Sequence, residues 1–237
     1  MAYYRYCGDV LMIYAFSGLL FGLLIPYMSR RFAKFMPATL AYALYRLVKP
    51  VKRVSAVKRH GNWQYTKMMS QYRWRSVMWG ILTAALSYGA FYEWGSQLIW
   101  WKLIFIWLLL LSAEIDFRLL LLPDILTVPL LLAGFAFSAW TGLWTMPYDS
   151  SLAALFGYFV PALISLLFVR KNKDAFGGGD VKLLAAAGAW LGVEKLLYTI
   201  VGACILFALY AAVTRKRQGA FGPAISAAAI AVAFYYF

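Results

Sequence analysis

The chain has 237 residues, of which 64% are hydrophobic and 14% are charged, whereas an ordinary globular domain has about 45–50% apolar and about 25% charged residues. This composition excludes a soluble enzyme, and two cysteines with one histidine exclude a disulfide scaffold and a zinc tetrad. The net charge of +14 is interpreted as a mark of membrane topology rather than of nucleic-acid binding, because cytoplasmic loops collect Lys and Arg.

Apolar runs, cut at charged and turn residues, predict an all-α polytopic membrane protein with about eight transmembrane helices. We expect a first transmembrane helix in 1–28, a basic loop at 29–75 and a membrane-embedded core at 76–237. The predicted spans are 10–28, 76–92, 97–116, 125–144, 151–169, 181–192, 196–214 and 220–237. Within the loop, 38–49 has the pattern of an amphipathic helix at the membrane surface, with an ordinary connecting loop as the alternative.

The basic residues predict the orientation. The loop 29–75 holds 12 of them and no acidic residue, and placing it in the cytoplasm brings 20 of the 23 basic residues to that side. Both termini are then expected on the outer side of the membrane. The segment 181–192 rises only about 18 Å as a helix against a hydrocarbon core of about 30 Å. We therefore expect its N-terminal end to lie in a wet, protein-lined cavity.

Acidic residues are rare, and four of the nine lie at inner ends of the predicted spans, where an ionisable group is costly unless it is paired, wet or functional. These four are Glu114, Asp116, Asp124 and Asp180. Taken alone, Asp116 fits an interfacial acid paired with Arg118, and Asp180 fits a helix N-cap after the glycines. Asp124, after Pro123, is interpreted first as the cap of 125–144, and Glu114 as an acid with a polar partner between helices.

Taken together, Asp116 and Asp180 predict more, because alternation of the spans delivers both to one membrane face. Two carboxyl groups held close share a proton and titrate as a pair. One can then take a proton from water while the other donates to a peptide carbonyl oxygen, which is the chemistry of an aspartic protease and needs no metal.

Further residues near this pair are candidates for substrate binding or support. Gly177, Gly178 and Gly179 precede Asp180 and would allow the extended backbone of a substrate to approach closely, with a flexible loop as the alternative. Asp124 has a possible supporting role, and Lys182 is either a marker of the cytoplasmic side or a charge that lowers the pKa of the pair.

Several segments resemble one family, the type IV prepilin peptidases. The first-aspartate segment is Ile115-Asp116-Phe117-Arg118 followed by Leu122-Pro123-Asp124, and the Gly-x-Gly-Asp segment runs from Gly177 to Gly192. Phe221-Gly222-Pro223 and Arg73-Trp74-Arg75 resemble the starts of the last and second spans. The resemblance covers roughly 73–237.

The resemblance implies a membrane aspartic endopeptidase with Asp116 and Asp180 as the catalytic pair. Its substrates would be prepilins or pseudopilins of type IV pili or type II secretion, cut after a short basic leader. The active site would face the cytoplasm from the bacterial cytoplasmic (inner) membrane, with both termini periplasmic. Membrane lipids, and no nucleic acid, are the other expected partners.

One part departs from the family. Bifunctional members carry a zinc loop of Cys-x-x-Cys pairs between the first two spans, and the loop 29–75 has no cysteine. We therefore expect a peptidase without support for N-methyltransferase activity, and neither zinc nor S-adenosylmethionine as a cofactor. Two alternatives remain: a small proton- or cation-coupled transporter that uses the aspartates as a relay, and a non-catalytic assembly factor for pili or secretion.

Overall fold

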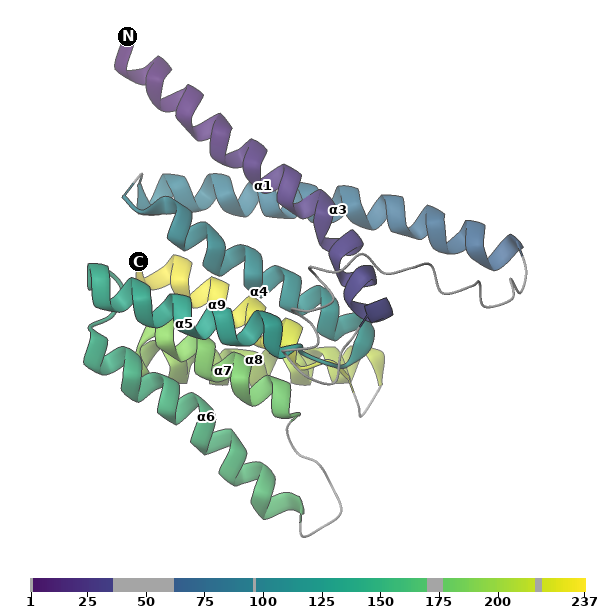
Figure 1. The fold of residues 1–237 in the computed structure, drawn as a ribbon, viewed down its shortest axis with the longest axis vertical. Helices are drawn as coiled ribbons and strands as arrows, with labels where there is room; N and C mark the ends of the chain where they lie inside the picture. The colour runs from purple at the N-terminus through teal and green to yellow at the C-terminus, as the bar shows by residue number, and fades with distance from the viewer. Residues whose placement is uncertain (1, 36–61, 96, 170–176, 216–218) are drawn as a thin grey trace. The chain divides into compact units, whose positions relative to one another are not determined.

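The computed structural model describes residues 2–35, 62–95, 97–169, 177–215 and 219–237, and these residues form eight α-helices and no strand (Figure 1). The helices are α1 (Ala2–Phe35), α3 (Asn62–Trp94), α4 (Ile99–Leu119), α5 (Asp124–Thr141), α6 (Pro147–Val169), α7 (Gly178–Leu191), α8 (Val193–Thr214) and α9 (Gly222–Tyr236). Each predicted span falls on one helix, so the predicted all-α class is confirmed. The chain folds as two compact units, Met1–Tyr92 and Glu93–Phe237.

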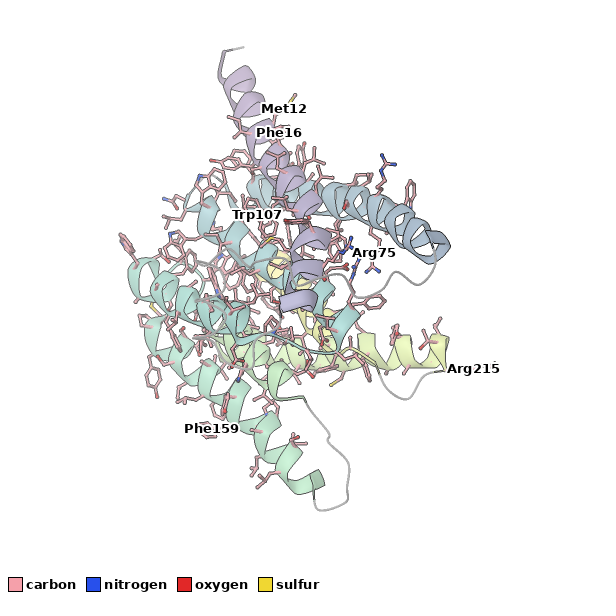
Figure 2. All side chains as sticks on the ribbon, turned by 45° about the vertical axis from the view of Figure 1, so that its right-hand side comes forward. Met12, Phe16, Arg75, Trp107, Phe159 and Arg215 are labelled. Carbon is pink, nitrogen blue, oxygen red and sulfur yellow. The ribbon has the colours of Figure 1, made fainter. Side chains whose placement is uncertain are left out.

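Four of these helices contain stretches that are long and apolar enough to cross a membrane: Leu11–Arg30, Asp124–Thr141, Pro147–Leu166 and Val193–Thr214. Apolar side chains also cover outer surfaces, as with Met12 and Phe16 on α1 and Phe159 on α6, which is 62% exposed (Figure 2). Extended apolar surface of this kind suits contact with lipid rather than with water. The protein is a polytopic membrane protein, while the number of spans and the side of the termini stay predictions.

In the first unit, α1 and α3 pack antiparallel through small residues. Tyr14 stacks on Phe91 at a ring-centroid distance of 5.1 Å, and a Cβ atom on Gly22 would lie 2.7 Å from the Cα atom of Gly80. Helix α1 continues to Phe35 and α3 begins at Asn62, so helices extend into both ends of the predicted loop 29–75. The predicted surface helix at 38–49 lies outside the described residues.

In the second unit, the short helix α7 is the most enclosed. It contacts α5, α6, α8 and α9, and its residues from Leu183 to Leu191 are all buried (Figure 1). Its 14 residues rise about 21 Å, less than the hydrocarbon thickness of about 30 Å. The surrounding helices therefore provide the apolar environment that lipid provides for a longer helix.

Glycines bring α6 and α7 into close contact. A Cβ atom on Gly157 would lie 2.7 Å from the carbonyl oxygen of Leu184, and one on Gly188 would lie 2.6 Å from the carbonyl oxygen of Ala153. Small residues at such crossings let two helix backbones approach directly, which is a common way for helices to associate in membranes.

Trp190, near the end of α7, anchors this helix to its neighbours. Its ring is fully buried, and its Nε1–H group donates a hydrogen bond of 2.8 Å to the carbonyl oxygen of Leu130 on α5. The ring also lies 5.1 Å from those of Phe105 on α4 and Phe137 on α5. A satisfied indole within an aromatic cluster combines a large buried area with a directional bond, and so fixes the position of α7 along the bundle.

Candidate active site

Asp116 lies in the last turn of α4 and is only 5% exposed. The helix ends just beyond it, where Leu120 adopts a left-handed conformation with φ of 53° and donates its N–H to the carbonyl oxygen of Asp116 at 2.8 Å. The side chain of Asp116 accepts a hydrogen bond of 2.8 Å at Oδ2 from the N–H group of Gly222, the first residue of α9. The start of the last helix therefore holds the first carboxyl group of the candidate pair.

Gly222 has to be small for this bond to form. A Cβ atom at this position would lie 2.7 Å from Oδ2 of Asp116 and 3.0 Å from its Cγ atom, closer than side chains approach one another. The sequence pattern marked Phe221-Gly222-Pro223 as a motif but gave Gly222 no role in the site. The signal in the sequence was a glycine directly before a proline at the predicted start of a helix. That Gly222 bonds to Asp116 could not be predicted, because it depends on how α4 packs on α9.

Asp180 is the third residue of α7, and Gly177 is the N-cap residue. The alternative that Asp180 itself is the N-cap is therefore wrong. Its carboxylate instead accepts a hydrogen bond from the backbone N–H of Gly177. An acid at the third position that reaches back to the N-cap N–H group is one half of a capping box, so the local sequence fixes where this carboxyl group points.

The structure brings the carboxyl groups of Asp116 and Asp180 close enough for their charges to repel. Asp180 stands one residue before the predicted span 181–192. Burial raises the pKa of Asp180, repulsion from Asp116 raises it further, and the N–H group of Gly177 lowers it, with the result that the pKa lies at about 6 instead of 3.8. Two carboxyl groups from different helices, of which one titrates well above its ordinary range, suit proton transfer.

The three glycines before Asp180 differ in their surroundings. A Cβ atom on Gly178 would meet nothing within 4 Å, one on Gly177 would lie 3.1 Å from Oδ2 of Asp180, and one on Gly179 would lie 2.6 Å from the Cβ atom of Leu122. Gly178 and Gly179 belong to the first turn of α7, so the flexible-loop alternative is wrong for these two. Gly179 leaves room for Leu122 to pack against it, and Gly177 leaves room for the carboxylate of Asp180.

Asp124 and Lys182 form an ion pair beside the site, with 2.6 Å between Oδ1 and Nζ. Pro123 is the N-cap residue of α5 and no side chain caps this helix, so the predicted capping role of Asp124 is wrong. Asp124 is the first residue of α5 and joins the start of this helix to the start of α7. The two side chains remain 48% and 38% exposed.

Glu114 and Arg118 also pair, with 2.6 Å between Oε1 and Nε, four residues apart on α4. Arg118 therefore pairs with Glu114 rather than with Asp116, whereas the expected partner of Glu114 on another helix stays a prediction. Asp116 instead accepts a hydrogen bond from Gly222 and lies close enough to Asp180 for the two charges to repel. Among the described side chains, no three His, Cys, Asp or Glu residues gather as a metal site would require, and His60 lies outside this part of the chain.

Residues 103–212 match the type IV leader peptidase family. These residues are similar to that family over a little less than half of the chain. The chain is 41% identical over 128 residues to the prepilin leader peptidase/N-methyltransferase of Escherichia coli K12, covering 51% of this chain and 56% of that protein. It is 41% identical over 109 residues to the protein of the same name from Aeromonas hydrophila, covering 43% and 37%, and 34% identical over 135 residues to that from Burkholderia pseudomallei K96243, covering 54% and 43%.

The chain thus spans about half, or less, of the length of these curated relatives. No solved structure matches it. The matched residues contain both Asp116 and Asp180, whereas Gly222 follows them. The hydrogen bond from Gly222 to Asp116 therefore extends the candidate site beyond the matched residues into the last helix.

Proposed function

We propose that this protein is a membrane aspartic endopeptidase in which Asp116 and Asp180 activate water. The observation that carries the proposal is the juxtaposition of two carboxyl groups from α4 and α7, each with its own backbone N–H donor. A solvated or merely structural acid needs no second carboxyl group beside it. Burial of like charges is unfavourable, so an arrangement that retains it indicates chemical use.

The roles of the two residues are proposed from the groups around each carboxyl. Asp180, whose pKa is raised to about 6 by burial and by repulsion from Asp116, is assigned the proton of the pair, and Asp116, which accepts the N–H of Gly222, is assigned as the base. Asp116 takes a proton from water as the water oxygen bonds to the scissile carbonyl carbon, while Asp180 gives its proton to the carbonyl oxygen. Collapse of the tetrahedral intermediate breaks the C–N bond, returns the proton of that oxygen to Asp180, and delivers the proton on Asp116 to the departing amine.

The substrates proposed are prepilins or pseudopilins, cut after a short basic leader next to a glycine. The relatives from Escherichia coli and Aeromonas hydrophila are named prepilin leader peptidases, and Asp116 and Asp180 both fall in the matched domain. We place the site at the cytoplasmic face of the bacterial inner membrane, where the basic loops are predicted. Lipids are the other proposed partners, and the peptidase is proposed to work without zinc or S-adenosylmethionine.

Co-expression with a prepilin tests the proposal. Asp116→Asn and Asp180→Asn should each abolish leader removal, seen as a mobility shift of the pilin, while Glu194→Gln, an exposed acid in the first turn of α8, should process normally. Full processing by both aspartate variants, or none by the native chain, would overturn the assignment. Mass spectrometry of the mature N-terminus should show no added methyl group.

A further inference from the structure

Two serine hydroxyl groups are buried close to Asp116 without a hydrogen-bond partner among the described residues. Ser112 on α4 is fully buried and Ser226 on α9 is 1% exposed. Several other helical hydroxyls donate to the carbonyl oxygen four residues earlier, as in Thr83, Ser151 and Thr199. Ser112 and Ser226 make no such bond. Ser29 on α1 and Thr127 on α5 are also buried without a partner among the described residues, but only Ser112 and Ser226 lie one helical turn from Asp116 and from its donor Gly222. Buried polar groups in native proteins are nearly always paired, so two unpaired hydroxyls indicate an unassigned polar function.

The packing of α4 on α9 places Ser112 and Ser226 at the same level of the bundle. The helices run antiparallel, because Asp116 at the end of α4 meets Gly222 at the start of α9, while Trp94, before α4, lies 4.7 Å from Phe234 near the end of α9. Moving four residues back from Asp116 along α4 and four forward from Gly222 along α9 reaches Ser112 and Ser226. Both therefore lie about 6 Å along the helix axes from the level of Asp116, toward the centre of the bundle.

We propose that Ser112 and Ser226 bind a single water molecule beneath Asp116, and that this water donates a hydrogen bond to the Asp116 carboxyl group. A buried water needs two to four polar partners, and the two hydroxyls and the carboxylate supply three. Hydroxyls can donate or accept by rotation, and an ionised carboxylate only accepts. The three groups can therefore all bond one water without leaving a donor facing a donor.

This inference rests on the proposed peptidase function, and it assigns Ser112 and Ser226 as positioning residues. The bound water is proposed to be distinct from the one consumed, because Ser112 and Ser226 lie toward the centre of the bundle from Asp116, away from the helix ends Leu119 and Gly222. The Asp116 carboxyl group would accept one hydrogen bond from the N–H of Gly222 and another from the water, and these two bonds would keep it in the orientation that proton transfer requires.

Other charged groups around Asp116 bear on any pH measurement. They are Asp180 on α7, the Glu114–Arg118 pair on α4 and the Asp124–Lys182 pair between α5 and α7. Helix α9 carries no charged residue from Gly222 to Tyr236. The Ser112 and Ser226 variants leave all of these groups unchanged, so a shift in the pH dependence of cleavage would report on Asp116 and its partner Asp180.

A double-mutant cycle in detergent tests the water site. Ser112→Ala and Ser226→Ala should each lower the melting temperature by about 2–4 °C, and the double variant should lose no more than the larger single effect, because either change removes the bridge. Ser226→Ala should have a smaller effect on melting in an Asp116→Ala background. Alanine variants that melt higher than the native chain, strictly additive losses, or an unchanged effect without Asp116 would each overturn the proposal.

Cleavage of a synthetic peptide with a basic leader and a prepilin-type junction provides the second readout. Each alanine variant should lower kcat about tenfold with little change in KM, and should move the alkaline limb of the pH profile. The control is Ser138→Ala on α5, which removes a buried hydroxyl bonded at 2.9 Å to the carbonyl oxygen of Thr145 and should change stability alone. An unchanged pH profile in Ser112→Ala and Ser226→Ala would refute the positioning role. If the native chain does not cleave the peptide, the proposed peptidase function is refuted, and the double-mutant cycle on melting temperature still tests the water site.

Discussion

Replacement of Gly179 by alanine should displace Asp180, whereas the same change at Gly178 should not. Both residues lie in the first turn of α7, so the gain in helix propensity, at most about 1 kcal/mol, is shared by the two variants. A Cβ atom on Gly179 would lie 2.6 Å from the Cβ atom and 3.2 Å from the carbonyl oxygen of Leu122. Carbon atoms prefer about 3.5–4.0 Å, so relief requires a movement of about 1 Å, and backbone atoms cannot rotate away.

The expected cost of this overlap is about 1–3 kcal/mol, or roughly 2–12 °C in melting temperature for a chain of this size. A shift of about 1 Å next to a reacting group can reduce the rate about 100-fold. Peptide cleavage by Gly179→Ala should therefore fall about 100-fold, mainly in kcat, while Gly178→Ala should lose far less activity and gain at most about 1 kcal/mol in stability. Melting is followed by the fluorescence of the ten tryptophans. Equal behaviour of the two variants would refute the packing argument.

Three further predictions concern the ionisation and packing of α7. The pKa of Asp180 is raised to about 6 from 3.8, so its ionisation destabilises the folded state as the pH rises between these values. Asp180→Asn should therefore gain stability relative to the native chain from pH 4 to pH 7, by at most about 3 kcal/mol. A constant difference in melting temperature across this range would contradict this expectation. Lys182→Gln should cost less than about 1 kcal/mol in a melting experiment, because its ion pair with Asp124 is exposed, and a larger loss would show that the pair is shielded from solvent. Gly157→Ala should lower the melting temperature by several degrees, since its Cβ atom would lie 2.7 Å from the backbone oxygen of Leu184, and unchanged melting would show that α6 and α7 separate without cost.

The helices could be predicted from the sequence because apolar runs, charged loops and turn residues are local features. The predicted span 97–116 corresponds to α4 at Ile99–Leu119, and 181–192 to α7 at Gly178–Leu191. The two aspartates could also be selected from the sequence, since carboxyl groups at the inner ends of apolar helices are rare and costly. The structure adds that they interact, and their catalytic role stays a prediction.

The partners of the charged side chains could not be predicted, because they depend on the register between helices. Asp124 was expected to cap a helix, but its carboxylate binds Lys182 across to α7. Asp149, in the first turn of α6, accepts hydrogen bonds from the hydroxyl of Thr145 at 2.9 Å and from the N–H group of Val193, at the start of α8, at 3.2 Å. A single sequence contains no information about which helix ends meet.

The enclosure of α7 has a consequence for synthesis. A helix of 14 residues is too short to settle across a bilayer on its own, and α8 and α9, which cover part of it, leave the ribosome later. We expect α7 to reach its final position only after both have inserted. Asp180 then gains part of its enclosed surroundings and Asp116 its donor, Gly222, from helices that follow α7 in the chain. The proposed peptidase site would therefore be completed only after α9 has been synthesised.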